Sequence, residues 1–191
     1  MCVYNLTSLE FLWSHPLNQS HASFMAVNSA TLIAYSSEYF NVTEIKRYHF
    51  ETGAEAAPLP LKKNGMAISL RYVQGCTFLL ESDELYITTN QEENSQGDIF
   101  VFDASTGELK YAFDVSLSLG LAEMEGITLV DPRAKLRTGT LRHGQPRTSA
   151  GRRLRMYVVA NVVSLWATVT VLEFTLPSSN IPRRAHANSS S

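Results

Sequence analysis

The sequence predicts an all-β protein made of repeated units of short antiparallel strands. Two observations support this fold class. A strand–turn–strand phrase, clearest in GDIFVFDASTGELKYAF (97–113), recurs along the chain at a spacing of about 50 residues, and each copy is rich in short strands. Self-similarity at such a period is typical of solenoids and propellers, in which each unit is one small sheet.

The phrase at 97–113 has the pattern of a tight hairpin. Ile99 to Phe102 is apolar at every position, which predicts a strand that is covered on both faces. From Leu109 to Val115 large apolar residues occupy every second position, as expected for a strand with one buried face. Between them, Asp103 can bond nearby backbone groups and Gly107 accepts a positive φ. We therefore expect an inner strand, a short loop, and an outer, half-exposed strand.

Similar units occur before and after this phrase. In TEIKRYHFETGAE (43–55), the pair Thr52-Gly53 follows a strand as Thr106-Gly107 does, and TLIAYSS (31–37) has the place of ELYITTN (84–90). A third copy consists of EGITLVDP (125–132), LRMYVVAN (154–161) and ATVTVLEFTLP (167–177). The predicted organisation begins with an N-terminal segment at 1–23. Three repeats follow, at about 24–74, 75–122 and 123–177, and a disordered tail occupies 178–191.

The second unit resembles a known repeat. LYITTN followed by GDIFVFDASTGELKYAF is similar to a blade of the YVTN-type β-propeller family, in which a Tyr-Val-Thr-Asn-like strand precedes a V-x-D-x-x-T-G hairpin. MYVVAN (156–161) matches the first half of that pattern, whereas VLEFTLP (171–177) lacks the Thr-Gly turn. The resemblance covers roughly residues 24–177 and implies propeller blades. The alternative is a β-sandwich or another sheet, because Asp-x-x-Thr-Gly hairpins occur in many all-β proteins.

Three blade-like units are too few for a closed propeller, which usually has about four to eight blades. Either another copy completes the ring, or the chain is part of a longer protein. The opening MCVYNLTSLEFLW has no signal-peptide shape and enters in the middle of a fold pattern, which favours a fragment. We therefore expect an incomplete ring whose exposed blade edges can cause self-association.

A basic segment lengthens the third unit. Eight Lys or Arg and no acid lie between Pro132 and Arg155. The stretch has no period of a helix or a strand and is rich in Gly, Thr, Ser and Arg, so we expect a disordered loop insertion at 133–153. Contact with nucleic acid or another anionic partner is the alternative. No aromatic residue is interleaved with the arginines, which disfavours base stacking.

The segment MYVVANVVSLWATVTVL (156–172) carries no charge and follows a basic flank. Its length is at the lower limit for a membrane-spanning helix. It is dominated by Val and Thr, which favour strands, and the repeat alignment divides it around residues 161–166. Two buried blade strands are the expectation, with a membrane anchor as the alternative.

Cysteines and glycosylation motifs bear on the compartment. Two cysteines do not make a disulfide framework, and Cys76, at the start of an apolar strand, is expected to be a free buried thiol. Four N-glycosylation sequons begin at Asn5, Asn18, Asn41 and Asn188. They favour an extracellular location, whereas chance occurrence in a chain without a signal peptide leaves the location open.

Candidate site residues cluster in AEMEGITLVD (122–131). Glu123 and Glu125 precede an apolar strand, and Asn90 and Asn161 end the equivalent segments LYITTN and MYVVAN. The Glu-Gly pair resembles the metal-binding entry strand of gluconolactonase-like and phytase-like propellers, which implies calcium or another divalent ion bound through oxygen donors. The alternative is that the two acids are solvated and the two Asn residues form local backbone bonds.

Three functional classes follow. The first is a non-enzymatic propeller segment that serves as a scaffold and binds a protein or a small ligand at the propeller face. The second is a metal-dependent propeller hydrolase or lactonase, complete or degraded. The third is a membrane-anchored surface protein. The sequence contains no Gly-rich phosphate loop and no Gly-x-Ser-x-Gly motif.

Overall fold

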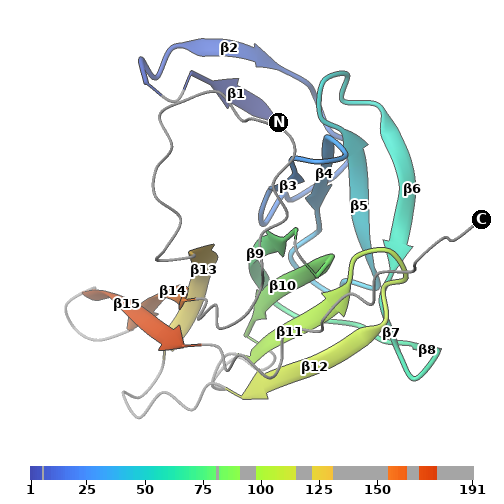
Figure 1. The fold of residues 1–191 in the computed structure, drawn as a ribbon, viewed down its shortest axis with the longest axis vertical. Coiled ribbons are helices and arrows are strands. Elements are labelled where there is room, and N and C mark those ends of the chain that lie inside the picture. Colours follow the sequence, from blue (N-terminus) through green and yellow to red (C-terminus); the bar gives the residue numbers. More distant parts are fainter. Residues whose placement is uncertain are drawn as a thin grey trace, which may run out of the picture.

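The computed structural model describes residues 1–5, 7–80, 82–90, 98–114, 122–130, 155–162 and 168–175. Within these ranges the regular elements are all strands. The sheets follow one another around an arc that does not close (Figure 1). The expected all-β class, with blades of an incomplete ring, is confirmed.

The first blade is a four-stranded antiparallel sheet whose strands follow chain order. From the innermost to the outermost they are β3 (Ala26–Asn28), β4 (Ile33–Ser36), β5 (Glu44–His49) and β6 (Glu55–Pro60). Ile45 and Tyr48 of β5 and Tyr35 of β4 are buried, while the acids that begin β5 and β6 are exposed. Apolar side chains therefore fix which faces of these strands point inward.

The second blade repeats this architecture. Its strands are β9 (Val73–Leu79), β10 (Glu84–Thr89), β11 (Asp98–Asp103) and β12 (Leu109–Asp114), again antiparallel and in chain order. Every residue of β10 is buried, as are Ile99, Val101 and Phe102 of β11. In β12, Lys110 and Ala112 are exposed, whereas Tyr111 and Phe113 are half-buried. This is the arrangement of a covered strand followed by an outer strand with one wet face.

The remaining strands form three smaller sheets. They are β13 (Ala122–Val130), β14 (Arg155–Val162) and β15 (Thr168–Thr175), then the N-terminal hairpin of β1 (Cys2–Tyr4) and β2 (Phe11–Ser14), and the short pair β7 (Lys62–Lys63) and β8 (Met66–Ala67). The uncharged run 156–172 thus contributes to two strands, and none of the described residues belongs to a helix long and apolar enough to cross a membrane. The basic segment 133–153 and the tail 178–191 lie outside the described residues.

The main core joins the first two blades. Its buried members come from both sheets and from the connection between them: Tyr35, Val42, Ile45, Leu59, Leu61, Leu70, Val73, Leu85, Ile87, Phe102 and Ala104. Burial of each large apolar side chain contributes about 1.5–3 kcal/mol relative to exposure. The two adjacent blades therefore share one core.

The turn of the second blade is also a contact between blades. Gly107 has a φ of +73°, as the sequence predicts, and its carbonyl oxygen accepts a hydrogen bond from the Lys62 backbone at 2.9 Å. A Cβ placed on Gly107 would lie 2.0 Å from the Pro60 carbonyl oxygen. Glycine is therefore required here both for the backbone conformation and for the close approach of the first blade.

Candidate functional site

The inner strands of the second and third sheets meet at the end of β10. Asn90 directly follows this strand, and its Oδ1 accepts a hydrogen bond from the backbone N–H of Met124 in β13 at 3.2 Å. Nearby, a Cβ on Gly75 of β9 would lie 2.8 Å from the Cα of Gly126, so the two backbones approach closely. We call the group of Gly75, Thr89, Asn90 and Met124 the inner-strand site.

Among the residues that the structure describes, two buried polar atoms of the inner-strand site have no hydrogen-bond partner. These are the hydroxyl of Thr89, which is fully buried, and the Nδ2 amide of Asn90, which is 8% exposed. Leaving a buried donor or acceptor unpaired costs about 1–3 kcal/mol. Asn90 lies against β13 through its bond to Met124, so its amide can offer a hydrogen bond to a polar group that enters between the sheets, while the Thr89 hydroxyl is one position earlier in the chain.

The structure brings some of the predicted site residues together. Asn90 contacts the backbone between Glu123 and Glu125, and the strand register places Glu123 opposite Asn161. The side chain of Glu125 is exposed, and those of Glu123 and Asn161 lie outside what the structure describes. Among the described residues, no three His, Cys, Asp or Glu side chains are grouped as metal ligands. The metal assignment of these four residues stays a prediction.

Thr89 is part of the site although the sequence pattern alone did not distinguish it. The available signal was the pair Thr88-Thr89 in ELYITTN, two consecutive polar residues on a strand that is otherwise apolar. Both threonines are fully buried, but Thr88 donates its hydroxyl to the Gly75 carbonyl at 3.4 Å whereas Thr89 has no partner. Only the fold distinguishes them.

A second polar cluster lies at the opposite end of β10, around Glu84, which is 1% exposed. Its Oε2 accepts hydrogen bonds from the hydroxyls of Ser82 at 2.7 Å and Tyr86 at 3.1 Å. Lys110 Nζ lies 2.6 Å from Oε1 and forms an ion pair with the carboxylate. The hydroxyl of Tyr111 lies 2.8 Å from that of Tyr86. The cluster reaches across β11 and connects β10 with β12.

The two phenols of this cluster stay protonated at neutral pH. Burial raises the pKa of Tyr86, and the hydrogen bond to Tyr111 raises it further. Burial also raises the pKa of Tyr111, to about 12, although its hydrogen bond with Tyr86 acts in the opposite direction. Each phenol has one proton to donate, so the two hydroxyls form a short chain of hydrogen bonds that ends on Glu84 Oε2, which is a structural role.

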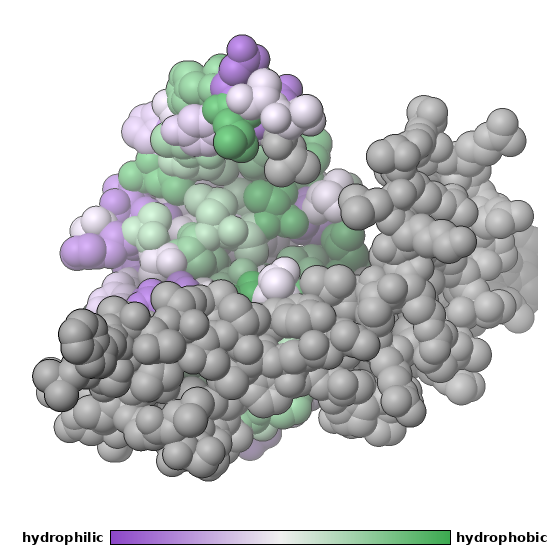
Figure 2. All heavy atoms as spheres, turned by 90° about the vertical axis from the view of Figure 1, so that its left-hand side faces the viewer, coloured by the Kyte–Doolittle hydropathy of each residue, from purple (hydrophilic) through white to green (hydrophobic). Residues whose placement is uncertain are grey.

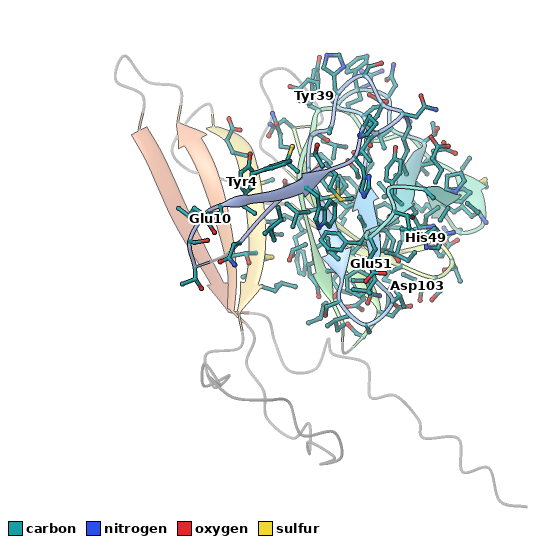
Figure 3. All side chains as sticks on the ribbon, turned by 90° about the horizontal axis from the view of Figure 1, so that it is seen from above. Tyr4, Glu10, Tyr39, His49, Glu51 and Asp103 are labelled. Carbon is teal, nitrogen blue, oxygen red and sulfur yellow. The ribbon has the colours of Figure 1, made fainter. Side chains whose placement is uncertain are left out.

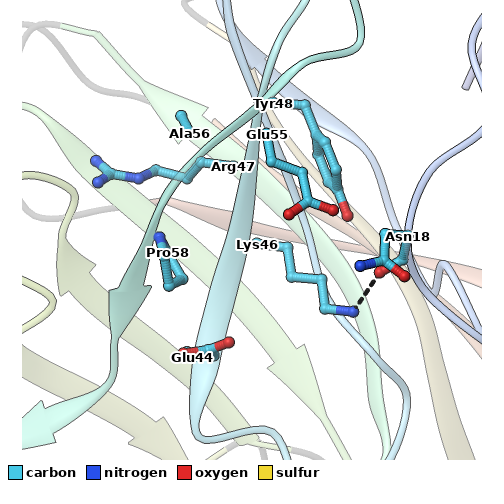
Figure 4. Close-up of a pocket in the computed structure, with 8 residues that line it drawn as sticks. All are labelled: Asn18, Glu44, Lys46, Arg47, Tyr48, Glu55, Ala56 and Pro58. Atoms are coloured by element: carbon cyan, nitrogen blue, oxygen red, sulfur yellow. Dashed lines mark hydrogen bonds between the residues drawn. The ribbon is translucent and has the colours of Figure 1, made fainter.

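A shallow pocket of about 180 Å³ lies on β5 and β6 of the first blade (Figure 4). Its lining includes two bases and two acids, Lys46, Arg47, Glu44 and Glu55. Lys46 donates a hydrogen bond to the Asn18 carbonyl at 2.6 Å and forms an ion pair with Glu38 at 2.9 Å. Both signs of charge are present and Lys46 is already paired, so the lining does not present a single sign of charge.

Comparisons with known proteins concern the fold. No protein-family model matches the chain, and no curated protein matches it in sequence. Among solved structures it is similar to Saccharomyces cerevisiae Sqt1, at 15% identity over 92% of this chain and 39% of that chain with a TM-score of 0.45. It is also similar to hydrazine synthase of Kuenenia stuttgartiensis, at 8% identity over 90% of this chain and 47% of that chain with a TM-score of 0.44.

A third similar structure is the β-propeller domain of Myceliophteria thermophila Cps50 (Swd1), at 10% identity over 86% of this chain and 42% of that chain, with a TM-score of 0.42. The chain spans less than half the length of each of these three proteins. Its own two four-stranded blades, with a third sheet packed beside them, establish a β-propeller-like fold.

Proposed function

We propose that this chain is a propeller segment of the YVTN type that acts as a non-enzymatic scaffold and binds an extended polypeptide or a small polar ligand at the inner-strand site. The observation that supports this function is the unpaired amide of Asn90 where the inner strands meet, together with the unpaired hydroxyl of Thr89 at the preceding position. Both groups are held by a buried strand that is continuous with the core of two blades. A ligand carbonyl or hydroxyl that displaces part of their surroundings supplies the hydrogen bonds that these two buried groups lack.

To test this proposal, peptides that bind the intact chain are selected from a random displayed library. Thr89→Val removes a hydroxyl that has no partner, so the variant should fold with unchanged or higher stability and should lose binding of the selected peptides. Thr88→Val is the matched control: it removes a hydroxyl bonded to Gly75 and should lower stability but leave binding unchanged. If the selected peptides bind Thr89→Val as well as they bind the natural protein, the inner-strand site is not the binding site.

A divalent-metal site for a propeller hydrolase or lactonase is the second candidate. The contact of Asn90 with Met124, between the two predicted acids, favours it, as does the register of Glu123 opposite Asn161. Calcium should then raise the melting temperature, since saturation at about 100 times the Kd stabilises by about 2.7 kcal/mol. Loss of that increase in Glu125→Ala would support the metal-dependent enzyme class. If calcium does not raise the melting temperature of the natural protein, this second candidate function is excluded.

We further propose that the natural ring contains more blades than this chain supplies. The open arc of sheets supports this proposal (Figure 1). Exposed blade edges also make self-association an expected property of the isolated chain. Sequencing of the adjoining reading frame tests the proposal directly, because additional Asp-x-x-Thr-Gly hairpins should continue there at the same spacing.

A further inference from the structure

The N-terminal hairpin has the same turn as the second blade. Asn5 Oδ1 accepts hydrogen bonds from the backbone N–H groups of Thr7 at 2.9 Å and Ser8 at 3.0 Å. In the second blade, Asp103 Oδ1 accepts the equivalent bonds from the residues two and three positions later, at 3.1 and 2.8 Å. The backbone bonds that close the two turns also correspond, with Leu9 in the place of Gly107.

The register of the two hairpins is also the same. Tyr4 pairs with Phe11 and Val3 with Trp13, and an irregularity separates the two pairs. In the second blade the equivalent pairs, Phe102 with Leu109 and Val101 with Tyr111, are separated by an irregularity at the same place. Each residue of the second-blade hairpin lies 98 positions later in the chain than its counterpart in the N-terminal hairpin. The hairpin β1–β2 therefore has the geometry of the two outer strands of a blade.

The hairpin differs from its counterparts at one edge. β5 and β11 each pair with a strand on both sides, whereas β1 pairs only with β2 among the described residues. Met1 exchanges two hydrogen bonds with His15, at 2.7 and 2.9 Å, on the side of β2. Because hydrogen-bonding direction alternates along a strand, the backbone groups of Cys2 and Tyr4 point to the free edge.

The side chains of the hairpin are exposed where their counterparts are covered. Tyr4 is 55% exposed, while Phe102 and Tyr48 at the equivalent positions are 0% and 1% exposed. Four of the large exposed apolar residues belong to this hairpin: Tyr4, Leu9, Phe11 and Leu12. Figure 2 views the open side of the arc and shows apolar side chains at the surface, including its upper part where the hairpin lies. Such a patch is typical of an interaction surface.

The hairpin is held firmly enough to present this edge. The rings of Trp13 and Phe50 pack edge-to-face with centroids 5.2 Å apart, and His15 Nε2 lies 2.9 Å from the Glu51 carbonyl oxygen. Both contacts join the hairpin to the turn of the first blade. A strand added beside β1 would therefore continue an existing interface between blade-like sheets.

We propose that the free edge of β1 is a docking site for an extended polypeptide strand in which tyrosine is flanked by small or aliphatic residues. The two complete blades define this chemistry. At the position equivalent to Val3, the neighbouring inner strand contributes Tyr35 in the first blade and Tyr86 in the second. At the position equivalent to Tyr4, it contributes Ala34 and Leu85, respectively. The incoming strand adds antiparallel to β1, with main-chain hydrogen bonds that supply affinity and side chains that supply specificity. This site is independent of the inner-strand site.

The test measures binding of a labelled peptide with the sequence of residues 83–89, Asp-Glu-Leu-Tyr-Ile-Thr-Thr, to the full chain by fluorescence anisotropy. Cys2→Pro removes an N–H at the free edge, and Cys2→Ser is the matched control that keeps it. We expect the natural chain and Cys2→Ser to bind the peptide equally. Cys2→Pro should bind about tenfold more weakly, as expected for the loss of one main-chain hydrogen bond.

A second arm leaves the protein unchanged. Peptides N-methylated at the Leu and Ile positions lose the N–H groups that face β1 and should not bind, whereas N-methylation at the Tyr position should be tolerated. Equal binding of both methylated peptides would overturn the proposal, as would no binding of the unmodified peptide. Self-association of the chain that Cys2→Pro abolishes but the peptide does not reverse would assign the edge to a second copy instead.

Discussion

The outer hairpin of the second blade and the N-terminal hairpin share a turn and a strand register, yet one is buried and the other is exposed. Phe102 is fully buried because β10 and the first blade cover it, whereas Tyr4 at the same position is 55% exposed. The local sequence thus determines the turn, and the neighbouring strands determine the burial. Comparing substitutions at matched positions separates the two contributions.

The largest expected difference is between Phe102→Ala and Tyr4→Ala. Phe102 is a member of the core between the blades, so its truncation leaves a cavity and should cost about 3–5 kcal/mol of unfolding free energy. Tyr4→Ala removes an exposed ring and should cost less than about 1 kcal/mol. Chemical denaturation measures both values. Similar costs at the two positions would mean that the hairpin is covered in solution.

The next largest effect is expected at Gly107. Gly107→Val introduces a Cβ that meets the Pro60 carbonyl oxygen and also requires a positive φ, so it should destabilise by more than the roughly 1–2 kcal/mol of the backbone conformation alone. Gly107→Ala has the same strain with less bulk and serves as the control. A cost below 1 kcal/mol for both variants would show that the turn does not dock on the first blade.

Much of the second blade could be predicted from its sequence, because its signals are local. The alternation in β12, the covered run in β11 and the positive φ of Gly107 depend on residues close together in the chain. The N-terminal hairpin escaped prediction because it has Leu9, with a φ of +57°, where glycine would mark the turn. The ion pair of Glu84 with Lys110 depends on the register of three strands, which no short motif specifies.

The candidate site was predictable in part for the same reason. Asn90 stood out as the end of a repeated segment, and it does contact the Glu123–Glu125 strand through Met124. The unpaired state of the Thr89 hydroxyl depends on which groups the fold brings near it, which is a long-range property. Cys76 is free, as expected, but it is half-buried where a buried thiol was predicted, and burial raises the pKa of the thiol.

A smaller difference in stability between the two matched turns should depend on pH, because one turn has Asp103 where the other has Asn5. Burial tends to raise the pKa of Asp103, but hydrogen bonds from Thr106 and Ser105 lower it overall. Asp103 lies with Glu51 of the first-blade turn on the side of the molecule away from Tyr39 (Figure 3). Because the pKa of this carboxyl is lower in the folded than in the unfolded protein, its ionised form stabilises the fold at pH values above the unfolded pKa, near 3.9. This stabilisation is lost as the pH falls through the folded-state pKa.

Asp103→Asn, which imitates Asn5, should therefore remove part of the fall in stability in that acidic range. At neutral pH it should cost about 1 kcal/mol, since a hydrogen bond to a charged group is replaced by a neutral one. Urea denaturation between pH 3 and pH 7 measures the difference. A stability profile with the same slope in both proteins would mean that Asp103 does not carry the effect.

The smallest expected effect is a gain. Leu9 has a φ of +57°, at which a Cβ costs about 1–2 kcal/mol, so Leu9→Gly should relieve strain, offset in part by the greater entropy of glycine in the unfolded chain. We expect a net stabilisation of up to about 1 kcal/mol. Thermal unfolding followed by the fluorescence of Trp13, which lies in this hairpin, measures it. A lower melting temperature would show that the 74% exposed Leu9 side chain makes contacts that support the fold.

Amide hydrogen exchange tests the central claim most directly, because it reports whether each backbone N–H is bonded. If β1 and β11 are equivalent strands that differ only in their inner neighbour, the amides of Phe100 and Phe102 should be strongly protected and those of Cys2 and Tyr4 should exchange rapidly. The amide of Val3, on the side of β2, should exchange more slowly than its two neighbours. Protection of Cys2 and Tyr4 comparable to that of Phe100 and Phe102 in the isolated monomer would contradict the account.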